Sequence, residues 1–225
     1  MEKTGQKPIS IEVNLIDSMG SDKTVVDAAR VSFNFRKKEW DDQKDTGLIS
    51  FLSRHNHWSP FSHCFATFYI KAPVFVARQL VKHQVGLAWN EVSRRYVDSN
   101  VESYTPAVWR RRPVNAKQGS GEDLEDKDGL CDYVYMDAIR HSESAYKYLI
   151  NHGVSPEQAR AVLPLSLMTE WYWSGSLYAF SRVCKLRLAD DAQKETRAVA
   201  LQISQHMSAL FPVSWKELLD GNRTD

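Results

Sequence analysis

An alternating apolar segment that leads directly into an apolar helix is the feature that most restricts the fold of this chain. From Cys64 to Ala72 an apolar residue recurs at every second position, which is typical of a strand with one buried face. Pro73 then suits the first position of a helix, and the next residues are largely apolar as far as Val81. We therefore expect a sheet with helices packed on it.

The remaining patterns predict an α+β fold. Alternation indicates two further strands, and apolar periodicity with suitable end residues indicates helices, as follows: strands 9–15 and 165–174; helices 21–33, 46–55, 130–152, 156–163, 176–188, 190–210 and 214–219. We expect Asp22 or Thr24 to cap the first helix and Ser155 to open a capping box with Gln158. The prediction is a single domain over residues 1–225, with a mixed or antiparallel sheet packed by helices and a helix-rich C-terminal half.

Composition excludes several classes of protein. The 225 residues carry a formal net charge of +1, which argues against a general polyanion binder. The three cysteines, Cys64, Cys131 and Cys184, are far apart and form no CxxC, so the sequence indicates neither a disulfide framework nor a zinc site. No apolar run approaches the roughly 20 residues of a membrane span, and the polar N-terminus lacks a secretory signal. We expect a cytoplasmic protein without a membrane or nucleic-acid partner.

The segment from Asp98 to Asp128 is predicted to be an irregular surface excursion. It contains three consecutive arginines, Arg110 to Arg112, followed by Pro113 and by the polar tract GSGEDLEDKDG. These arginines could contact a phosphate, but a solvated loop beside an acidic tract is the favoured interpretation.

Polar side chains gather in the segment Pro73–Tyr96, whose other residues are mostly apolar. A single histidine or arginine on a helix is more often a surface or structural group than a ligand contact. Here eight polar or charged residues share one segment: Arg78, Gln79, Lys82, His83, Glu91, Ser93, Arg94 and Arg95. This cluster is typical of a site for a nucleotide-like ligand, with Arg95 suited to a phosphate and Gln79 to the amide edge of a base.

Two more arginines, Arg160 and Arg187, are flanked by apolar residues near predicted helix ends. Such an arginine either extends to water or is held inward to meet an anion, and the sequence leaves both interpretations open. The common cofactor and catalytic motifs are absent: there is no GxGxxG, GxxxxGK[ST], HExxH or GxSxG, and no metal-ligand spacing of Cys and His. We expect no metal site, and any redox cofactor would need an unusual scaffold.

Several motifs together resemble those of the flavin-dependent thymidylate synthases, the ThyX family. They are SPFSH, FATFYIKAPVFVARQLVKHQ, NEVSRRY, ARAVLPLSL and KLRLADDAQ, and the similarity extends from about Ala28 to Gln193. The resemblance implies methylation of deoxyuridylate (dUMP) to thymidylate (dTMP), with the carbon taken from methylenetetrahydrofolate and the reducing equivalents from NADPH through bound FAD. It also implies a homotetramer whose active sites are assembled from neighbouring subunits.

On the flavin side the match is incomplete. The family's Arg-His-Arg signature corresponds to Lys82, His83 and Gln84, so only the histidine is retained, and eight residues separate Gln84 from Ser93 where the family usually has seven. Ser176 and Arg182 stand where many members carry asparagine, and Asp191 where a histidine is common. The resemblance implies FAD contacts at these residues: Ser32, His57, Ser59, Lys82, His83, Gln84, Glu91, Ser176 and Arg182.

On the substrate side the match is closer. The resemblance implies dUMP contacts at these residues: Arg78, Gln79, Lys82, Glu91, Ser93, Arg94, Arg95, Arg160 and Arg187. Arg187 is the predicted catalytic residue, because a permanent positive charge beside the base favours its N3-deprotonated form and raises the electron density at C5. Ser93 is interpreted as a substrate contact rather than a nucleophile, since the sequence places no histidine base beside it.

Two other functions remain as alternatives. The altered flavin signature is compatible with an FAD- or nucleotide-binding homologue that has lost catalysis. A single-stranded nucleic-acid-binding module would explain Arg110 to Arg112 together with the seven tryptophans and nine tyrosines, although the near-neutral charge argues against it. Flavin uptake and dUMP-dependent oxidation of NADPH distinguish these functions from thymidylate synthesis.

Overall fold

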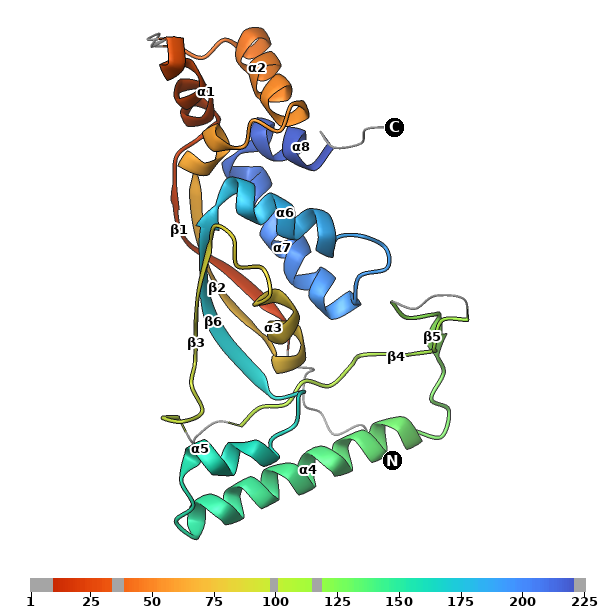
Figure 1. Ribbon diagram of the computed structural model, residues 1–225. Helices are drawn as coiled ribbons and strands as arrows, with labels where there is room; N and C mark the ends of the chain where they lie inside the picture. The colour runs from red at the N-terminus through yellow and green to blue at the C-terminus, as the bar shows by residue number, and fades with distance from the viewer. Residues whose placement is uncertain (1–9, 34–38, 98–100, 115–118, 221–225) are drawn as a thin grey trace.

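A four-stranded antiparallel sheet forms the centre of the computed structural model, which describes residues 10–33, 39–97, 101–114 and 119–220 (Figure 1). Its strand order is β1-β2-β6-β3, and each neighbouring pair is antiparallel. The strands are β1 (Glu12–Met19), β2 (Phe65–Pro73), β6 (Met168–Ser176) and β3 (Leu87–Glu91), and a separate two-stranded ladder pairs β4 (Trp109–Arg110) with β5 (Asp123–Leu124). The predicted α+β class with an antiparallel sheet is confirmed.

Eight α-helices among the described residues complete the fold, and most of them lie in the C-terminal half, as predicted. They are α1 (Asp22–Arg30), α2 (Asp42–Arg54), α3 (Val74–Leu80), α4 (Leu130–Asn151), α5 (Pro156–Ala159), α6 (Leu177–Arg187), α7 (Lys194–Leu210) and α8 (Pro212–Asp220). Short 3-10 turns occupy Val31–Phe33, Ser59–His63 and Arg160–Val162. None of the helices in the described ranges is long and apolar enough to cross a membrane.

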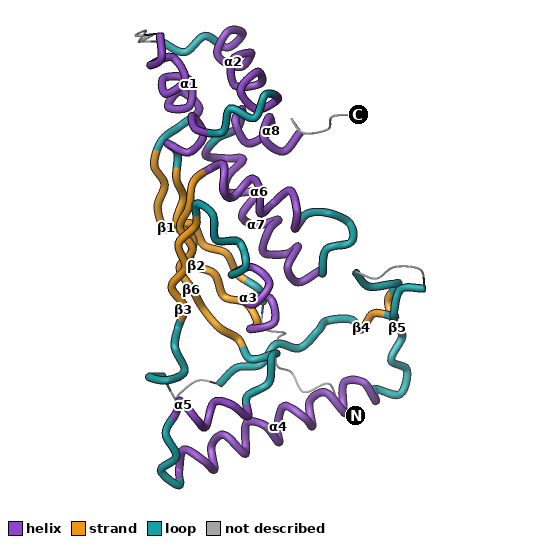
Figure 2. The backbone as a smooth tube through the Cα atoms, in the orientation of Figure 1, coloured by secondary structure: helices purple, strands orange, loops and turns teal. Residues whose placement is uncertain are grey.

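One face of the sheet carries the core. Along β2 the side chains of Ala66, Phe68 and Ile70 are buried, as the alternating pattern predicted, and Trp171 and Trp173 of β6 are buried beside them. Helices α3, α6 and α7 cover this face, whereas α4 lies apart at one end of the sheet (Figures 1 and 2). Because β2 ends where α3 begins, the residues that follow α3 stay close to the covered face.

The predicted helix caps are partly wrong. The N-cap of α1 is Ser21, whose backbone N–H donates to the Thr24 hydroxyl at 3.0 Å. Asp22 caps a different helix, since its carboxylate accepts from the backbone N–H groups of Val213 at 3.0 Å and Ser214 at 2.8 Å, at the start of α8. Ser155 makes no side-chain cap hydrogen bond to α5. Sequence spacing alone could not show that Asp22 meets a helix 191 residues further along the chain.

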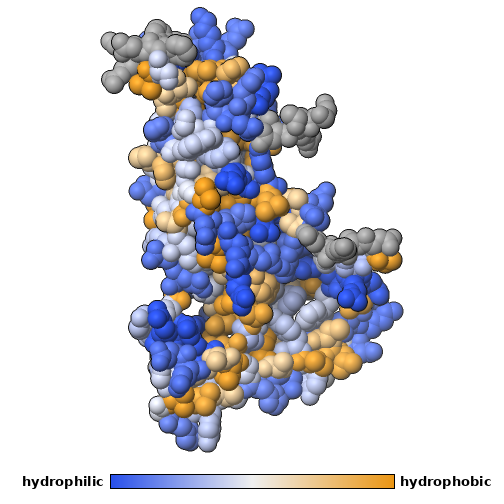
Figure 3. Space-filling view, viewed as in Figure 1, coloured by the Kyte–Doolittle hydropathy of each residue, from blue (hydrophilic) through white to orange (hydrophobic). Residues whose placement is uncertain are grey.

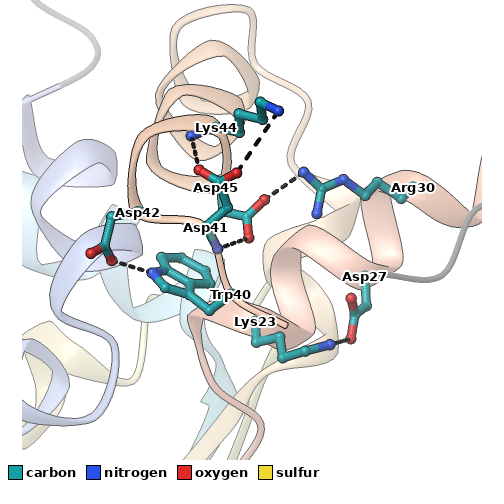
Figure 4. Close-up of polar contacts among 8 residues, drawn as sticks. All are labelled: Lys23, Asp27, Arg30, Trp40, Asp41, Asp42, Lys44 and Asp45. Atoms are coloured by element: carbon teal, nitrogen blue, oxygen red, sulfur yellow. Dashed lines mark hydrogen bonds and ion pairs between the residues drawn. The ribbon is translucent and has the colours of Figure 1, made fainter. Parts of the chain in front are cut away.

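Helices α1 and α2 are joined by a buried ion pair (Figure 4). The Arg30 guanidinium, at the end of α1, binds the carboxylate of Asp45, whose side chain is 1% exposed. The other oxygen of that carboxylate accepts from the backbone N–H of Asp41 at 2.8 Å. Since an unpaired charge is costly to bury, this pair fixes how the two helices pack.

The predicted surface excursion at 98–128 is not solvated throughout. Residues 98–100 and 115–118 of it lie outside the described residues. Arg110 is 19% exposed on its side chain and forms an ion pair with Glu195 of α7. The interpretation of Arg110 as a solvated residue is therefore wrong, whereas Arg111 and Arg112 are exposed.

Candidate active site

The first group of predicted site residues lies where α3 ends and α6 ends. Arg187 is the last residue of α6, and its Nε donates to Nε2 of His83 at 3.1 Å. Its Nη2 also donates to the backbone carbonyl of Gln79 at 3.5 Å. Of the two interpretations left open for Arg187, the structure therefore supports the inward one.

His83 is held in its neutral form. Burial lowers the pKa of His83 below its ordinary value, and the positive charges of Arg187 and Arg182 lower it further. Because Nε2 accepts a hydrogen bond from Arg187, the single ring proton is assigned to Nδ1. The hydrogen-bonding partner of the Arg187 guanidinium is therefore an uncharged imidazole.

The side-chain amide of Gln79 is oriented by the first turn of α7. Its Nε2 donates to Oε1 of Gln193, and its Oε1 accepts from the Thr196 hydroxyl at 3.2 Å. With both ends of the amide held, Gln79 presents a fixed pattern of donor and acceptor. This is the residue that the sequence predicts to recognise a pyrimidine.

The second group lines a cavity of about 550 Å³ at the far end of β3. Three predicted substrate residues contribute to it: Glu91, Arg94 and Arg160. The Glu91 carboxylate accepts from the Thr169 hydroxyl at 2.8 Å and from Nε1 of Trp89 at 3.1 Å. The charged residues of this lining are three cations, Lys71, Arg94 and Arg160, and three carboxylates, Glu91, Glu102 and Glu170. The two arginines can bind a phosphate, and the fixed Glu91 carboxylate can orient a neighbouring hydroxyl or amide.

Ser93 and Arg95 follow Glu91 in the turn after β3. Nε of Arg95 donates to the Ser93 hydroxyl oxygen at 3.2 Å, and the backbone N–H of Arg95 donates to the same oxygen at 3.3 Å. Within the described residues the hydrogen-bonding partner of Ser93 is thus an arginine rather than a histidine base. This geometry supports an anion contact instead of nucleophilic activation.

The two groups lie at opposite ends of β3, although the sequence places their residues in one segment. Leu87 to Glu91 pair with Gly175 to Trp171, and at about 3.3 Å per residue the strand separates its ends by roughly 13 Å. The 83–86 turn with His83 precedes the strand, and the cavity with Glu91 follows it. One chain therefore carries two half-sites, which we call the Arg187 group (Gln79, His83, Arg187) and the Glu91 group (Glu91, Arg94, Arg160).

Three of the predicted flavin contacts, His57, Ser59 and Ser176, lie near the start of α6, whereas Glu91 belongs to the second group at the far end of β3. His57 and Ser59 are exposed in the turn before β2, and the Trp58 ring lies 6.2 Å from the Tyr178 ring of α6. Ser176 caps that helix by accepting from the backbone N–H of Ala179 at 3.2 Å. The His57 ring also stacks against Phe51, with ring centroids 5.9 Å apart.

Among the remaining flavin candidates, Lys82 and Arg182 supply positive charge, whereas Gln84 and Ser32 are neutral. Lys82, Gln84 and Arg182 are exposed, and Arg182 lies close enough to His83 to lower the pKa of that histidine. Ser32 is exposed in the 3-10 turn after α1. Exposed cations can bind a diphosphate and exposed rings can stack on flat rings, so the chemistry of these residues is compatible with FAD.

Four residues that support these groups were not predicted as site residues: Trp89, Thr169, Gln193 and Thr196. Gln193 ends one of the motifs that carry the family resemblance, which was an available signal. Thr169 had no signal, because its contact with Glu91 depends on the pairing of β3 with β6. Trp89 and Glu91 are two residues apart on β3, so recognising that strand would have placed them on one face.

A comparison with models of protein families shows to which family the chain belongs. Residues 14–213 match the family model described as thymidylate synthase complementing protein. The chain belongs to this family.

Similar proteins are named as flavin-dependent thymidylate synthases. A flavin-dependent thymidylate synthase of Thermus thermophilus is 38% identical over 213 residues, covering 93% of this chain and 77% of the relative. One of Thermosipho melanesiensis is 35% identical over 212 residues, covering 93% of this chain and 91% of the relative.

Solved structures agree with this family membership. The UMP/dUMP methylase PolB of Streptomyces cacaoi, bound with 5-Br dUMP, superposes with a TM-score of 0.84 at 30% identity, covering 92% of this chain and 94% of that chain. The same enzyme bound with 5-Br UMP also gives a TM-score of 0.84, at 28% identity, covering 95% and 96% of the two chains.

Proposed function

We propose that this protein methylates dUMP at C5 to give dTMP, with methylenetetrahydrofolate as the carbon donor and NADPH as the reductant through bound FAD. The observation that carries the proposal is the inward position of Arg187, which is hydrogen bonded to neutral His83 and to the backbone of Gln79. A fixed cation beside a fixed amide suits a pyrimidine that must become electron-rich. Two relatives, at 38% and 35% identity, are named flavin-dependent thymidylate synthase.

Each half-site has a distinct task in this reaction. Arg187 would stabilise negative charge on the pyrimidine, and Gln79 would orient the ring through its amide. In the Glu91 group, Arg94 and Arg160 would bind the phosphate, with Arg95 and Ser93 beside them.

Glu91 is held by Trp89 and Thr169, so it can accept a hydrogen bond from the nucleotide without rearrangement. Arg78 and Lys82, both exposed on or after α3, add positive charge.

FAD, when bound, carries the reducing equivalents that convert the transferred one-carbon unit to a methyl group. The residues that would hold it are His57 and Ser59 before β2, Ser176 and Arg182 on α6, and Lys82, His83 and Gln84 after α3, with Ser32 and Glu91 contributing. Lys82 offers a charge to the diphosphate, but without the paired donors of the family's arginine.

We further propose that the active site is shared between subunits of a homotetramer in the cytoplasm. Within one chain the Arg187 group and the Glu91 group lie at opposite ends of β3, and neither alone supplies both pyrimidine and phosphate contacts. Bringing the Glu91 group of one subunit against the Arg187 group of another would complete one nucleotide site. Symmetric association satisfies both partners in the same way.

The test is a product assay on purified protein supplied with FAD, NADPH, methylenetetrahydrofolate and dUMP. We expect flavin to bind and dTMP to form, as identified by mass spectrometry, with no product when any one component is omitted. Parallel reactions with UMP report whether the ribonucleotide is also accepted. Flavin binding without dTMP from either nucleotide would favour a homologue without catalysis, and oligonucleotide binding without flavin would favour a nucleic-acid module.

A further inference from the structure

The strand β4 connects two parts of the molecule that otherwise lie apart. Its second residue, Arg110, donates from Nη2 to both carboxylate oxygens of Glu195, at 2.8 Å and 2.9 Å. Glu195 is only 6% exposed and belongs to the first turn of α7. The Tyr104 hydroxyl also lies within 3.5 Å of this carboxylate, and burial together with Glu195 raises the pKa of Tyr104 to about 12, so the hydroxyl keeps its proton as a donor.

Its first residue, Trp109, is anchored in the opposite direction, as expected for consecutive strand residues. Nε1 of Trp109 donates to the Asp132 carboxylate of α4 at 2.7 Å, and the Trp109 ring packs edge-on against Tyr135 with centroids 5.2 Å apart. The Tyr135 hydroxyl then donates to the backbone carbonyl of Tyr104 at 2.7 Å. The two residues of β4 thus bind α4 on one side and α7 on the other.

Each of these helices supports one half-site. The first turn of α7 contains Thr196 and follows Gln193, the two residues that orient the Gln79 amide. Helix α4 leads through α5 to the 3-10 turn with Arg160, and the Ser142 hydroxyl of α4 donates to the Val162 carbonyl in that turn. Arg110 and Glu195 therefore form a side-chain link between the two groups, in addition to the backbone hydrogen bonds that Val74 and Phe75 of α3 donate to the carbonyls of Leu167 and Leu165.

We call α4, α5 and the 3-10 turn that follows them the arm, which lies at one end of the sheet. Figure 3 shows the surface hollowed between α4 and the body of the molecule, and Figure 1 shows β4 lying between α4 and the near end of α7. A second, weaker contact joins this region to α7, since the Lys194 ammonium lies 3.6 Å from the Asp123 carboxylate of β5. This pair is exposed and contributes little, whereas the Arg110–Glu195 pair, with side chains 19% and 6% exposed, is less screened by solvent.

We propose that Arg110 and Glu195 are positioning residues for nucleotide binding, because they fix the arm that carries Arg160 relative to the helix that orients Gln79. This inference rests on the proposed function. Neither residue needs to touch the nucleotide. Loss of the pair would let the two half-sites drift out of the spacing that assembled subunits need to surround one dUMP, and a misplacement of about 1 Å is enough to weaken a preorganised site strongly.

The test compares Arg110→Gln, Arg110→Lys and Glu195→Gln with the matched control Arg111→Gln, an exposed arginine of the same loop. The dissociation constant for dUMP is measured by titration calorimetry on FAD-loaded protein, together with kcat and KM. We expect Arg110→Gln and Glu195→Gln each to weaken dUMP binding roughly tenfold, with FAD affinity unchanged, and the double variant to be no worse than either single one. Arg110→Lys should recover part of the loss, and Arg111→Gln should match wild type.

Two results would overturn the inference. One is wild-type affinity for dUMP in Arg110→Gln. The other is a parallel loss of FAD and dUMP affinity with a lowered melting temperature in both Arg110→Gln and Arg110→Lys, which would indicate a structural role only. Failure of the proposed function is seen separately, as a wild-type protein that neither binds dUMP nor forms dTMP.

Discussion

Arg187 donates from Nε to Nε2 of His83 at 3.1 Å, so the predicted catalytic residue and the retained histidine of the flavin signature are in direct contact. The contact requires a neutral imidazole, and burial with the neighbouring Arg187 and Arg182 charges lowers the pKa of His83 accordingly. If the proposed site assignments hold, this one hydrogen bond couples the electrostatics at the substrate base and at the flavin.

The first prediction concerns this coupling. Arg187→Ala removes one of the positive charges that disfavour protonation, so we expect the pKa of His83 to rise toward its ordinary value of 6.5. NMR titration of protein carrying isotope-labelled histidine measures the change. A conservative Arg187→Lys variant retains the charge and should leave the pKa of His83 low. An unchanged His83 titration in Arg187→Ala would contradict the assigned contact.

The same histidine predicts a pH dependence of stability. The pKa of His83 in the folded protein lies below the ordinary value of 6.5, so below pH 6.5 the unfolded chain binds the proton more readily than the folded one. The contribution of His83 to the free energy of unfolding is therefore complete above pH 6.5 and is lost as the pH falls below 6.5. Urea unfolding at pH values from neutral down to about 5 should show a falling free energy of unfolding. His83→Gln should flatten this dependence, and an identical slope in that variant would argue against the prediction.

The third prediction separates Arg187 from Ser93. Arg187→Ala should abolish dTMP formation, because it removes the cation predicted to stabilise the pyrimidine anion. Ser93→Ala should keep measurable activity, since its hydroxyl contacts Arg95 rather than a base. The readout is the initial rate of dTMP formation with bound FAD confirmed by absorbance. Complete loss of activity in Ser93→Ala, with FAD and dUMP still bound, would restore Ser93 as a candidate nucleophile.

A fourth prediction concerns stability at the α1–α2 contact. Asp45→Ala leaves Arg30 without its buried carboxylate partner, so we expect a loss of about 3–5 kcal/mol in the free energy of unfolding. The matched control in the same region is Asp27→Ala, which removes the i,i+4 ion pair with Lys23 on the surface of α1 and should cost about 0.3–0.5 kcal/mol (Figure 4). Equal losses in the two variants, measured by urea unfolding, would show that burial does not decide the cost.

A fifth prediction addresses the altered flavin signature. Lys82→Arg restores the family's arginine and adds a paired donor for a phosphate, so FAD should bind more tightly, by a factor on the order of ten. Gln84→Arg adds a second cation and should act in the same direction. Flavin fluorescence titration of each variant against wild type gives the comparison. Weaker FAD binding in both variants would mean that the flavin contacts of this chain depart from the family arrangement.

Local sequence patterns predicted much of the fold because they depend on neighbouring residues. The alternation that ends at Ala72 and the long periodic segment at 130–152 became β2 and α4. Strand β3 was missed, since its apolar residues Leu87 and Trp89 gain a buried face only by pairing with β6. Likewise, no spacing rule could reveal that Arg110 meets Glu195, 85 residues away.

For the candidate site, the sequence likewise predicted the residues but not their arrangement in space. Sequence reasoning selected Gln79, His83 and Arg187, which the structure brings together from segments more than 100 residues apart. It treated Glu91 and Gln79 as parts of one local cluster, whereas β3 places them at opposite ends of a strand. That separation is a property of the sheet, and it leads to the proposal of a site shared between subunits.

A subunit-mixing experiment tests the central claim most directly. Arg160→Ala damages the Glu91 group and Arg187→Ala the Arg187 group, so each variant alone should form almost no dTMP from dUMP. If one nucleotide site takes Arg160 from one subunit and Arg187 from another, coexpressed and randomly mixed variants should regain roughly one quarter of the wild-type rate. Absence of dTMP from mixed oligomers that bind FAD and assemble like wild type would contradict a dUMP site shared between subunits.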